Sequence, residues 1–168
     1  MGAGVTVLGI DPGSRCLGWG VVREDSGVLR LVDCGTIKAK SKDFSERIGE
    51  IYCALSTIVA SHAPDEAGIE NVFTHKNVLS ALKLGQARGA AIAACAAHSV
   101  PVFDYEPTLI KKSLVGTGNA EKSQVSFMVS RILGVHEQWE ADTSDALGCA
   151  ICHLNSRKLN MLLAARSR

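Results

Sequence analysis

Near its start the chain reads Val5-Thr6-Val7-Leu8-Gly9-Ile10-Asp11-Pro12-Gly13-Ser14, an apolar run that ends abruptly in a carboxylate. Valine, threonine and isoleucine are typical of a buried strand, and Pro12-Gly13-Ser14 stops such a strand and turns the chain. The turn leads into a second strand-like run from Leu17 to Val22, so the stretch predicts a hairpin. Asp11 then stands at the end of a buried strand, where it either caps the turn or meets chemical partners from elsewhere.

The later segments predict a mixed sheet. The expected strands are Val28 to Ile37, Ala67 to Glu70 and Pro101 to Tyr105; the expected helices are Phe44 to about Ser61, Asn77 to about Ala97, Pro107 to Leu114, Ala120 to Leu133 and Ala141 to about Leu163, the last with a break near Asn155. Short turns make the first three strands antiparallel, whereas intervening helices make the later strands parallel. We therefore expect an α/β fold with a five-stranded sheet, three strands antiparallel and then two parallel, covered by helices on both faces.

Length and composition limit the possible classes of protein. The 168 residues fit one domain, 1–168, with a mobile basic tail at about 157–168, and the net charge of +1 neither supports nor excludes nucleic acid. No apolar run reaches the roughly 18 residues that span a bilayer, and no secretory signal is evident. Six cysteines, mostly in apolar segments, are interpreted as free thiols of a cytoplasmic protein acting as small core residues.

Three further acids match Asp11 in position or spacing. Glu70 closes a predicted strand, and Asp142 and Asp145 stand three apart at the start of a helix, so both point to one face. Each has an ordinary alternative, since Glu70 suits a solvated sheet edge and Asp142 suits a helix N-cap. Together, however, four carboxylates form the oxygen-only ligand set that Mg²⁺ or Mn²⁺ prefers, and two such ions about 3.5–4 Å apart can cleave a phosphodiester.

Five motifs follow one another in the order and at the spacing of a known family. They are Gly9-Ile10-Asp11-Pro12-Gly13, Ile69-Glu70-Asn71-Val72-Phe73 with Lys76-Asn77, Ser80 to Gly89, Gly116-Thr117-Gly118 with Ala120 to Val125, and Asp142 to Gly148. Over roughly Val5 to His153 the chain resembles the RuvC family of bacterial Holliday junction resolvases. Thr74-His75 and the number of cysteines depart from the family pattern, but neither affects the acids.

The resemblance implies an RNase H-like fold and a homodimer that nicks four-way junction DNA symmetrically, with Mg²⁺, in recombination and repair. It also implies partnership with the RuvA and RuvB branch-migration machinery. The family's four acids fall on Asp11, Glu70, Asp142 and Asp145, and its functionally important lysines fall on Lys111 and Lys122.

Basic residues between positions 71 and 122 predict a DNA-binding surface. Six Lys and Arg face three acids there: Lys76, Lys83, Arg88, Lys111, Lys112 and Lys122. The excess suits a phosphate backbone, although an ordinary solvated surface is the alternative. Lys122 follows a Gly-rich turn at a predicted helix start and is placed to hold a phosphate, unless Gly118 or Asn119 merely caps the helix. Phe73 either stacks on an unpaired base or belongs to the core.

The helix from Asn77 to Ala97 is the candidate dimer interface. Leu79, Leu82, Gln86, Gly89 and Ala93 recur at helical spacing, and small residues permit a close approach, although a helix packed on its own sheet gives the same pattern. Cys149 to His153 spells a haem-attachment motif, but it lies in an apolar helix, so we expect core cysteines and no haem. A phosphate-binding hairpin of the sugar-kinase type is also disfavoured, because those proteins need two such domains.

Overall fold

The computed structural model describes residues 4–71, 77–136 and 139–166, with side chains up to Arg157. The strands are β1 (Val5–Asp11), β2 (Cys16–Asp25), β3 (Val28–Lys38), β4 (Glu66–Glu70) and β5 (Val102–Tyr105). The helices are α1 (Phe44–His62), α2 (Val78–Ala96), α3 (Pro107–Val115), α4 (Lys122–Leu133) and α5 (Ala141–Arg166). No helix in these ranges is long and apolar enough to cross a membrane.

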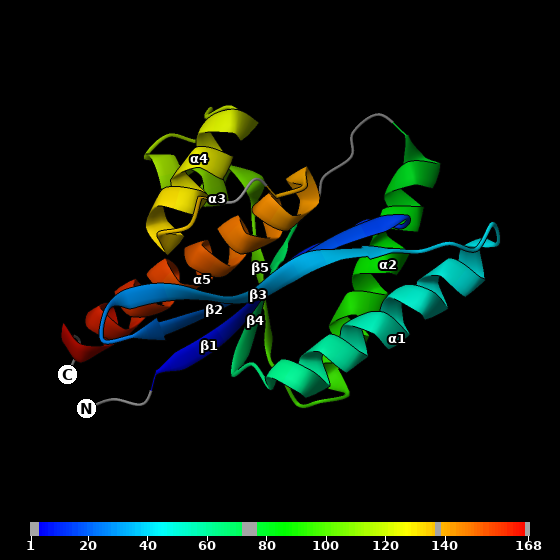
Figure 1. Cartoon of the computed structure of the whole chain (residues 1–168), viewed down its shortest axis with the longest axis horizontal. Coiled ribbons are helices and arrows are strands. Elements are labelled where there is room, and N and C mark those ends of the chain that lie inside the picture. Colours follow the sequence, from blue (N-terminus) through cyan, green and yellow to red (C-terminus); the bar gives the residue numbers. More distant parts are fainter. Residues whose placement is uncertain (1–3, 72–76, 137–138, 167–168) are drawn as a thin grey trace.

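The strands form one sheet in the order β3-β2-β1-β4-β5. β1 pairs antiparallel with β2 and β2 antiparallel with β3, whereas β4 runs parallel to both β1 and β5. Figure 1 shows α3, α4 and α5 over one face of the sheet and α1 with α2 over the other. The predicted mixed α/β sheet is therefore confirmed.

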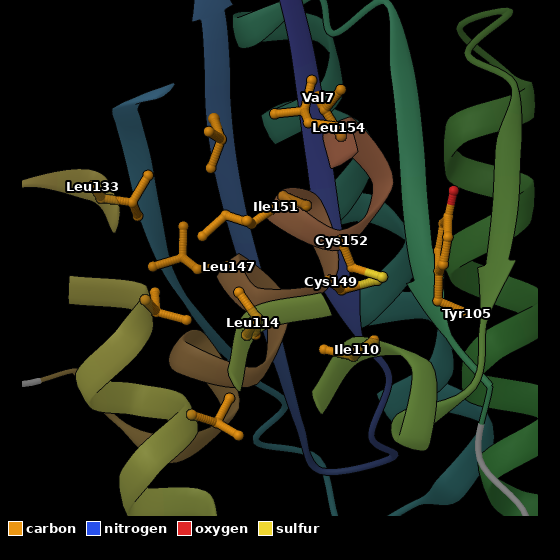
Figure 2. Packing of buried hydrophobic residues seen from close by; sticks show 14 of the residues in the cluster. Val7, Tyr105, Ile110, Leu114, Leu133, Leu147, Cys149, Ile151, Cys152 and Leu154 are labelled. Atoms are coloured by element: carbon orange, nitrogen blue, oxygen red, sulfur yellow. The ribbon is translucent and has the colours of Figure 1, made fainter. Parts of the chain in front are cut away.

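Alternation along β1 divides the core into two layers. Val7 packs with residues of α3, α4 and α5, whereas Leu8 and Ile10 pack with residues of α1 and α2. Figure 2 shows the first layer, in which Leu147, Ile151 and the two cysteines of α5 meet Leu114 of α3. All six cysteines are free; three are buried, Cys16 and Cys34 are half-buried, and Cys53 is exposed, so the core assignment was wrong for Cys53.

A row of glycines lets α5 lie directly on the sheet. Gly20, Gly9 and Gly68 are neighbours across β2, β1 and β4. A Cβ atom on Gly9 would lie only 1.9 Å from the carbonyl oxygen of Ala146 in α5, and one on Gly20 would lie 2.4 Å from Leu147 Cδ2. Gly18 makes the same approach, since its Cβ would lie 1.9 Å from the carbonyl oxygen of Asp142. Because these glycines have no Cβ atom, the start of α5 can lie close to the strand ends.

Two details of the helices differ from prediction. α5 continues through Asn155 without a break, and the side-chain amide of Asn155 donates to Ser113 Oγ at 3.1 Å. The N-cap of α4 is Glu121, not Gly118 or Asn119. Its backbone N–H donates to Gln124 Oε1 at 2.9 Å, so Lys122 is the first residue of the helix.

Candidate active site

The four predicted acids gather where β1 and β4 end. Asp11 and Glu70 are the last residues of these two parallel neighbours. Asp142 lies in the first turn of α5, after Ala141, so it is not the helix N-cap. Its carbonyl rests over Gly18, which is the cross-strand partner of Asp11. The glycine approach therefore places the α5 pair beside the two strand-end carboxylates.

The acids interact strongly through their charges. Burial, followed by repulsion from Glu70, Asp145 and Asp142, raises the pKa of Asp11 to about 8. Burial and the charge of Asp145 likewise raise the pKa of Glu70 to about 7. Glu70 is thus not a solvated edge charge. Burial contributes most to both pKa shifts, and repulsion between the carboxylates adds to it.

Lys122 supplies positive charge to this cluster. Its ammonium lies 2.9 Å from Asp145 Oδ2, and the ion pair raises the pKa of Lys122. Lys122 also lines a pocket beside the acids with Lys111, Glu70 and Asp145, and the apolar floor comes from Ile110 and Val125. Both lysines that the resemblance singled out therefore lie next to the acids.

The donor set fits a hard divalent cation, although it is not closed around one. Among the described residues, no three histidine, cysteine or acidic side chains converge as ligands of one ion. Nevertheless, the acids repel one another around Asp11, and only carboxylate oxygens are offered. A cation would relieve this repulsion, and Asp11, Glu70, Asp142 and Asp145 are the residues that would hold Mg²⁺ or Mn²⁺.

The other basic candidates lie in α2 or outside the described residues. The Arg88 guanidinium pairs with Asp104 of β5, and the Lys83 ammonium lies 5.9 Å from the centre of the Phe44 ring. Neither contact joins them to the acids. Phe73 and Lys76, with Thr74-His75, fall outside the described residues.

The sequence did not reveal that Cys16 touches the site. Its thiol forms a hydrogen bond with Asp142, and burial together with this bond raises the pKa of Cys16 to about 11. The position of Cys16, directly after the turn that follows Asp11, was the available signal. As a neutral donor, the thiol orients one carboxylate of the α5 pair.

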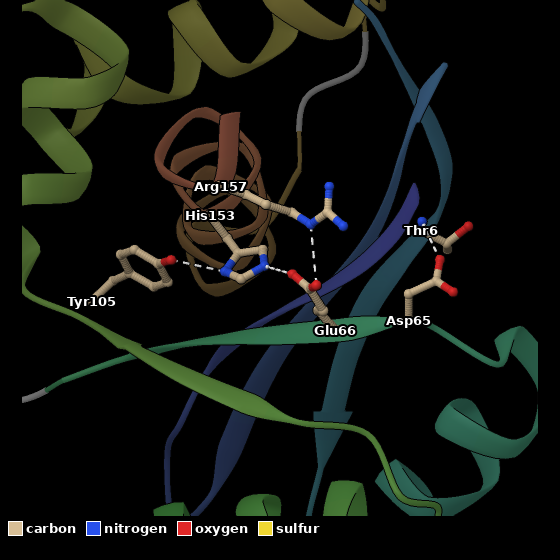
Figure 3. Close-up of polar contacts among 6 residues, drawn as sticks. All are labelled: Thr6, Asp65, Glu66, Tyr105, His153 and Arg157. Carbon is tan, nitrogen blue, oxygen red and sulfur yellow. Dashed lines mark hydrogen bonds and ion pairs between the residues drawn. The ribbon is translucent and has the colours of Figure 1, made fainter. Parts of the chain in front are cut away.

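A second polar network connects α5 to β4 and β5 (Figure 3). Burial lowers the pKa of His153. His153 Nε2 lies 2.6 Å from Glu66 Oε2 and Nδ1 lies 2.8 Å from the Tyr105 hydroxyl, and a neutral ring satisfies both contacts when Nε2–H donates to the carboxylate and Nδ1 accepts from the hydroxyl. Arg157 Nε donates to Glu66 Oε1 at 3.1 Å. The segment from Cys149 to His153 is accordingly part of the packed interior and not an exposed loop.

Comparison with known proteins identifies the family of this chain. The family model described as Crossover junction endodeoxyribonuclease RuvC matches residues 7–153. The chain belongs to the RuvC family of nucleases. A RuvC of Oleidesulfovibrio alaskensis is 65% identical over 161 residues, covering 96% of this chain and 97% of that protein. A RuvC of Vibrio vulnificus is 46% identical, covering 96% of this chain and 93% of that protein.

Solved structures of Holliday junction resolvases share the fold. Thermus thermophilus RuvC in complex with Holliday junction substrate superimposes with a TM-score of 0.87 at 32% identity, covering 93% of this chain and 96% of that one. The yeast mitochondrial Holliday junction resolvase Ydc2 has a TM-score of 0.64 at 12% identity, covering 87% and 76%. These matches confirm the expected RNase H-like fold of Holliday junction resolvases.

Proposed function

We propose that this chain resolves Holliday junctions in recombination and repair by hydrolysing two opposed phosphodiesters, with Asp11, Glu70, Asp142 and Asp145 holding two Mg²⁺ ions. The observation that carries the proposal is the gathering of four acids from β1, β4 and α5: burial, followed by repulsion from Glu70, Asp145 and Asp142, raises the pKa of Asp11 to about 8. Carboxylates are crowded in this way where a cation offsets their repulsion. Membership of a nuclease family supports the choice of a phosphodiester.

The chain's own residues divide the work at this site. When bound, the divalent ions supply the activated water and stabilise the leaving oxygen. The carboxylates fix the ions, and Mn²⁺ substitutes for Mg²⁺ because it accepts the same oxygen ligands. Lys122 and Lys111, which line the adjoining pocket, would hold the phosphate, and the thiol of Cys16 would keep Asp142 oriented.

A symmetric homodimer completes the activity, because one carboxylate cluster serves one scissile phosphate at a time whereas resolution needs two cuts. The α2 face proposed as the interface is exposed: Leu79 is 68% and Leu82 59% accessible. The opposite face of α2 is buried through Ala87, Ala91 and Ala94. The residues that pack α2 against its own chain thus differ from the exposed residues that could contact a second copy. We place the dimer in the cytoplasm, acting with RuvA and RuvB.

Cleavage of a synthetic four-way junction, beside linear duplex and RNA–DNA hybrid of the same sequence, tests the proposal. We expect paired symmetric nicks in the junction that require added Mg²⁺ and disappear with a chelator. Equal cleavage of the hybrid would identify a different nuclease activity. Binding without any cleavage, in the presence of Mg²⁺ or Mn²⁺, would leave a junction-binding protein and contradict the proposal.

The division of labour between subunits has its own test. A mixed dimer of one intact chain and one Asp11→Asn chain should convert a supercoiled cruciform plasmid to nicked circles, with almost no linear product. Homodimers of each chain provide the controls. Linear product at the parental rate would refute the assignment of one site to one strand.

A further inference from the structure

A cluster of exposed cations lies at the start of β2 and the end of β3, and none of its members lines the pocket of Lys111 and Lys122. We define the β2–β3 rim as Arg15, Lys38, Lys40 and Lys42, which are all exposed. Arg15 precedes β2, whereas the three lysines lie at the end of β3 and in its connection to α1. The backbone N–H of Ala39 donates to the Arg15 carbonyl at 2.9 Å and joins the two segments. Because β1 ends beside the start of β2, the rim borders the edge that carries Asp11.

A buried arginine fixes the two segments of the rim to each other. Arg47 of α1 is only 7% exposed. Its Nε donates to the carbonyl of Ser14 at 3.2 Å, and its Nη1 donates to the carbonyls of Ser41 and Lys42 at 3.1 and 2.9 Å. Arg47 therefore ties the turn that follows Asp11 to the segment that carries the lysines.

The partners of Arg47 are unusual for a buried guanidinium. Its hydrogen-bond acceptors are carbonyls, and across the described ranges no carboxylate oxygen lies within 4.0 Å of its nitrogens. Burial of a charge is costly unless an opposite charge or several hydrogen bonds compensate it. Here three carbonyls provide the compensation, and the guanidinium contacts both segments of the rim.

The acids near the rim are bound to the backbone and to hydroxyls. Glu50 accepts from the backbone N–H groups of Lys40 and Ser41 at 2.6 and 3.2 Å, and Glu46 accepts from Ser41 Oγ at 2.5 Å. Asp43 caps α1. Of the rim cations, Lys38 pairs with Glu140 at 2.5 Å.

The remaining three rim cations lack such pairing: within the structure's described part, Arg15, Lys40 and Lys42 have no carboxylate in ion-pair distance. Three unpaired cations on a preformed backbone suit a strand of phosphates better than a single anion.

We propose that the β2–β3 rim binds the phosphodiester backbone of a junction arm and that Arg47 is the residue that positions it. The inference rests on the proposed function and extends it to a second surface. Two cationic regions border the acids: Lys111 and Lys122 line the pocket with Glu70 and Asp145, and the rim lies at the start of β2 and the end of β3, beside the end of β1 that carries Asp11. A duplex whose scissile phosphate sits at Asp11 continues over one of these regions in each direction, and phosphate contacts set its register there.

The salt dependence of binding tests the rim. Junction binding is measured by fluorescence anisotropy with a chelator present, across a series of KCl concentrations, for wild type and Lys40→Gln/Lys42→Gln. Each lost phosphate contact reduces the slope of log affinity against log salt by about 0.9, so we expect a slope smaller by about 1 to 2. The matched control is Arg23→Gln/Arg30→Gln, which removes two exposed cations at the far end of the β2–β3 hairpin and should keep the wild-type slope.

A double-mutant cycle separates positioning by Arg47 from general destabilisation. If Arg47 acts through the rim lysines, Arg47→Gln weakens binding in the wild type but adds little in the Lys40→Gln/Lys42→Gln background. Circular dichroism confirms that each variant is folded at the assay temperature. Equal losses in both backgrounds would overturn the positioning role.

If the wild-type protein cuts junctions and the Lys40→Gln/Lys42→Gln variant keeps the wild-type salt slope, the proposal that the rim binds DNA is overturned. A wild type that neither binds nor cuts junctions would refute the proposed function instead.

Discussion

Replacing Gly9 by alanine should separate the α5 acids from Asp11. The new Cβ would lie 1.9 Å from the carbonyl oxygen of Ala146, and real Cβ contacts are essentially never shorter than 3.0 Å, so α5 and β1 must part by at least about 1.1 Å. Neighbouring Ala150 atoms at 2.7 and 2.9 Å block an easy sideways adjustment. Overpacking of this kind costs about 1–3 kcal/mol or more of stability.

The same displacement should reduce cleavage beyond its effect on folding. Ala146 directly follows Asp145, and a misplacement of about 1 Å commonly costs on the order of 100-fold in rate. The assay is single-turnover junction cleavage at saturating protein, at a temperature where circular dichroism shows the variant folded.

Gly49→Ala is the control for this substitution, because Gly49 lies in α1 at a position where a Cβ atom would point into open space. It should keep full activity and gain about 0.5–1 kcal/mol. A folded Gly9→Ala protein that cuts at the wild-type rate would refute the argument that the glycine row sets the site.

Three further predictions concern side chains. Removing any one carboxylate should lower the cleavage rate by orders of magnitude while junction binding persists. The four variants are Asp11→Asn, Glu70→Gln, Asp142→Asn and Asp145→Asn. A variant that cuts at more than about a tenth of the parental rate would remove that residue from the site. Lys122→Ala should lower the salt slope of junction affinity by about one and slow cleavage, whereas an unchanged slope and rate would make Lys122 an ordinary surface lysine. Burial lowers the pKa of His153 from its ordinary value of 6.5, so the imidazole takes up a proton less readily in the folded protein than in the unfolded chain. The free energy of unfolding should therefore fall as the pH drops below about 6.5. Urea unfolding at pH 7 and pH 5 measures the fall, which His153→Gln should reduce; an equal fall in the variant would assign it to other groups.

The sequence was most informative where its pattern is local. The apolar run from Val5, the turn at Pro12-Gly13 and the helical spacing from Phe44 predicted elements that the structure contains with small shifts at their ends. Strand-end positions for Asp11 and Glu70 followed from the same runs. Local patterns succeed here because each depends only on neighbours along the chain.

Features that depend on register were beyond single-sequence reasoning. Gly20, Gly9 and Gly68 form a row only once three strands are aligned, and nothing in their spacing along the chain shows it. The burial of Arg47 was equally hidden, because an arginine within an amphipathic helix is ordinarily assigned to the solvent face. Its carbonyl partners lie in two loops that the fold brings together.

The contact of β4 with α5 bears on the reorganisation that the reaction demands. Glu66, at the first residue of β4, is held by His153 and Arg157, and Gly68 at its centre lies under Cys149. Three of the four carboxylates therefore stand on two elements whose backbones are locked together before any substrate arrives. Fixed charges stabilise a transition state best when they need not move as its charge develops. The entropy of aligning these backbones is consequently lost during folding, and binding of the junction is spared that loss.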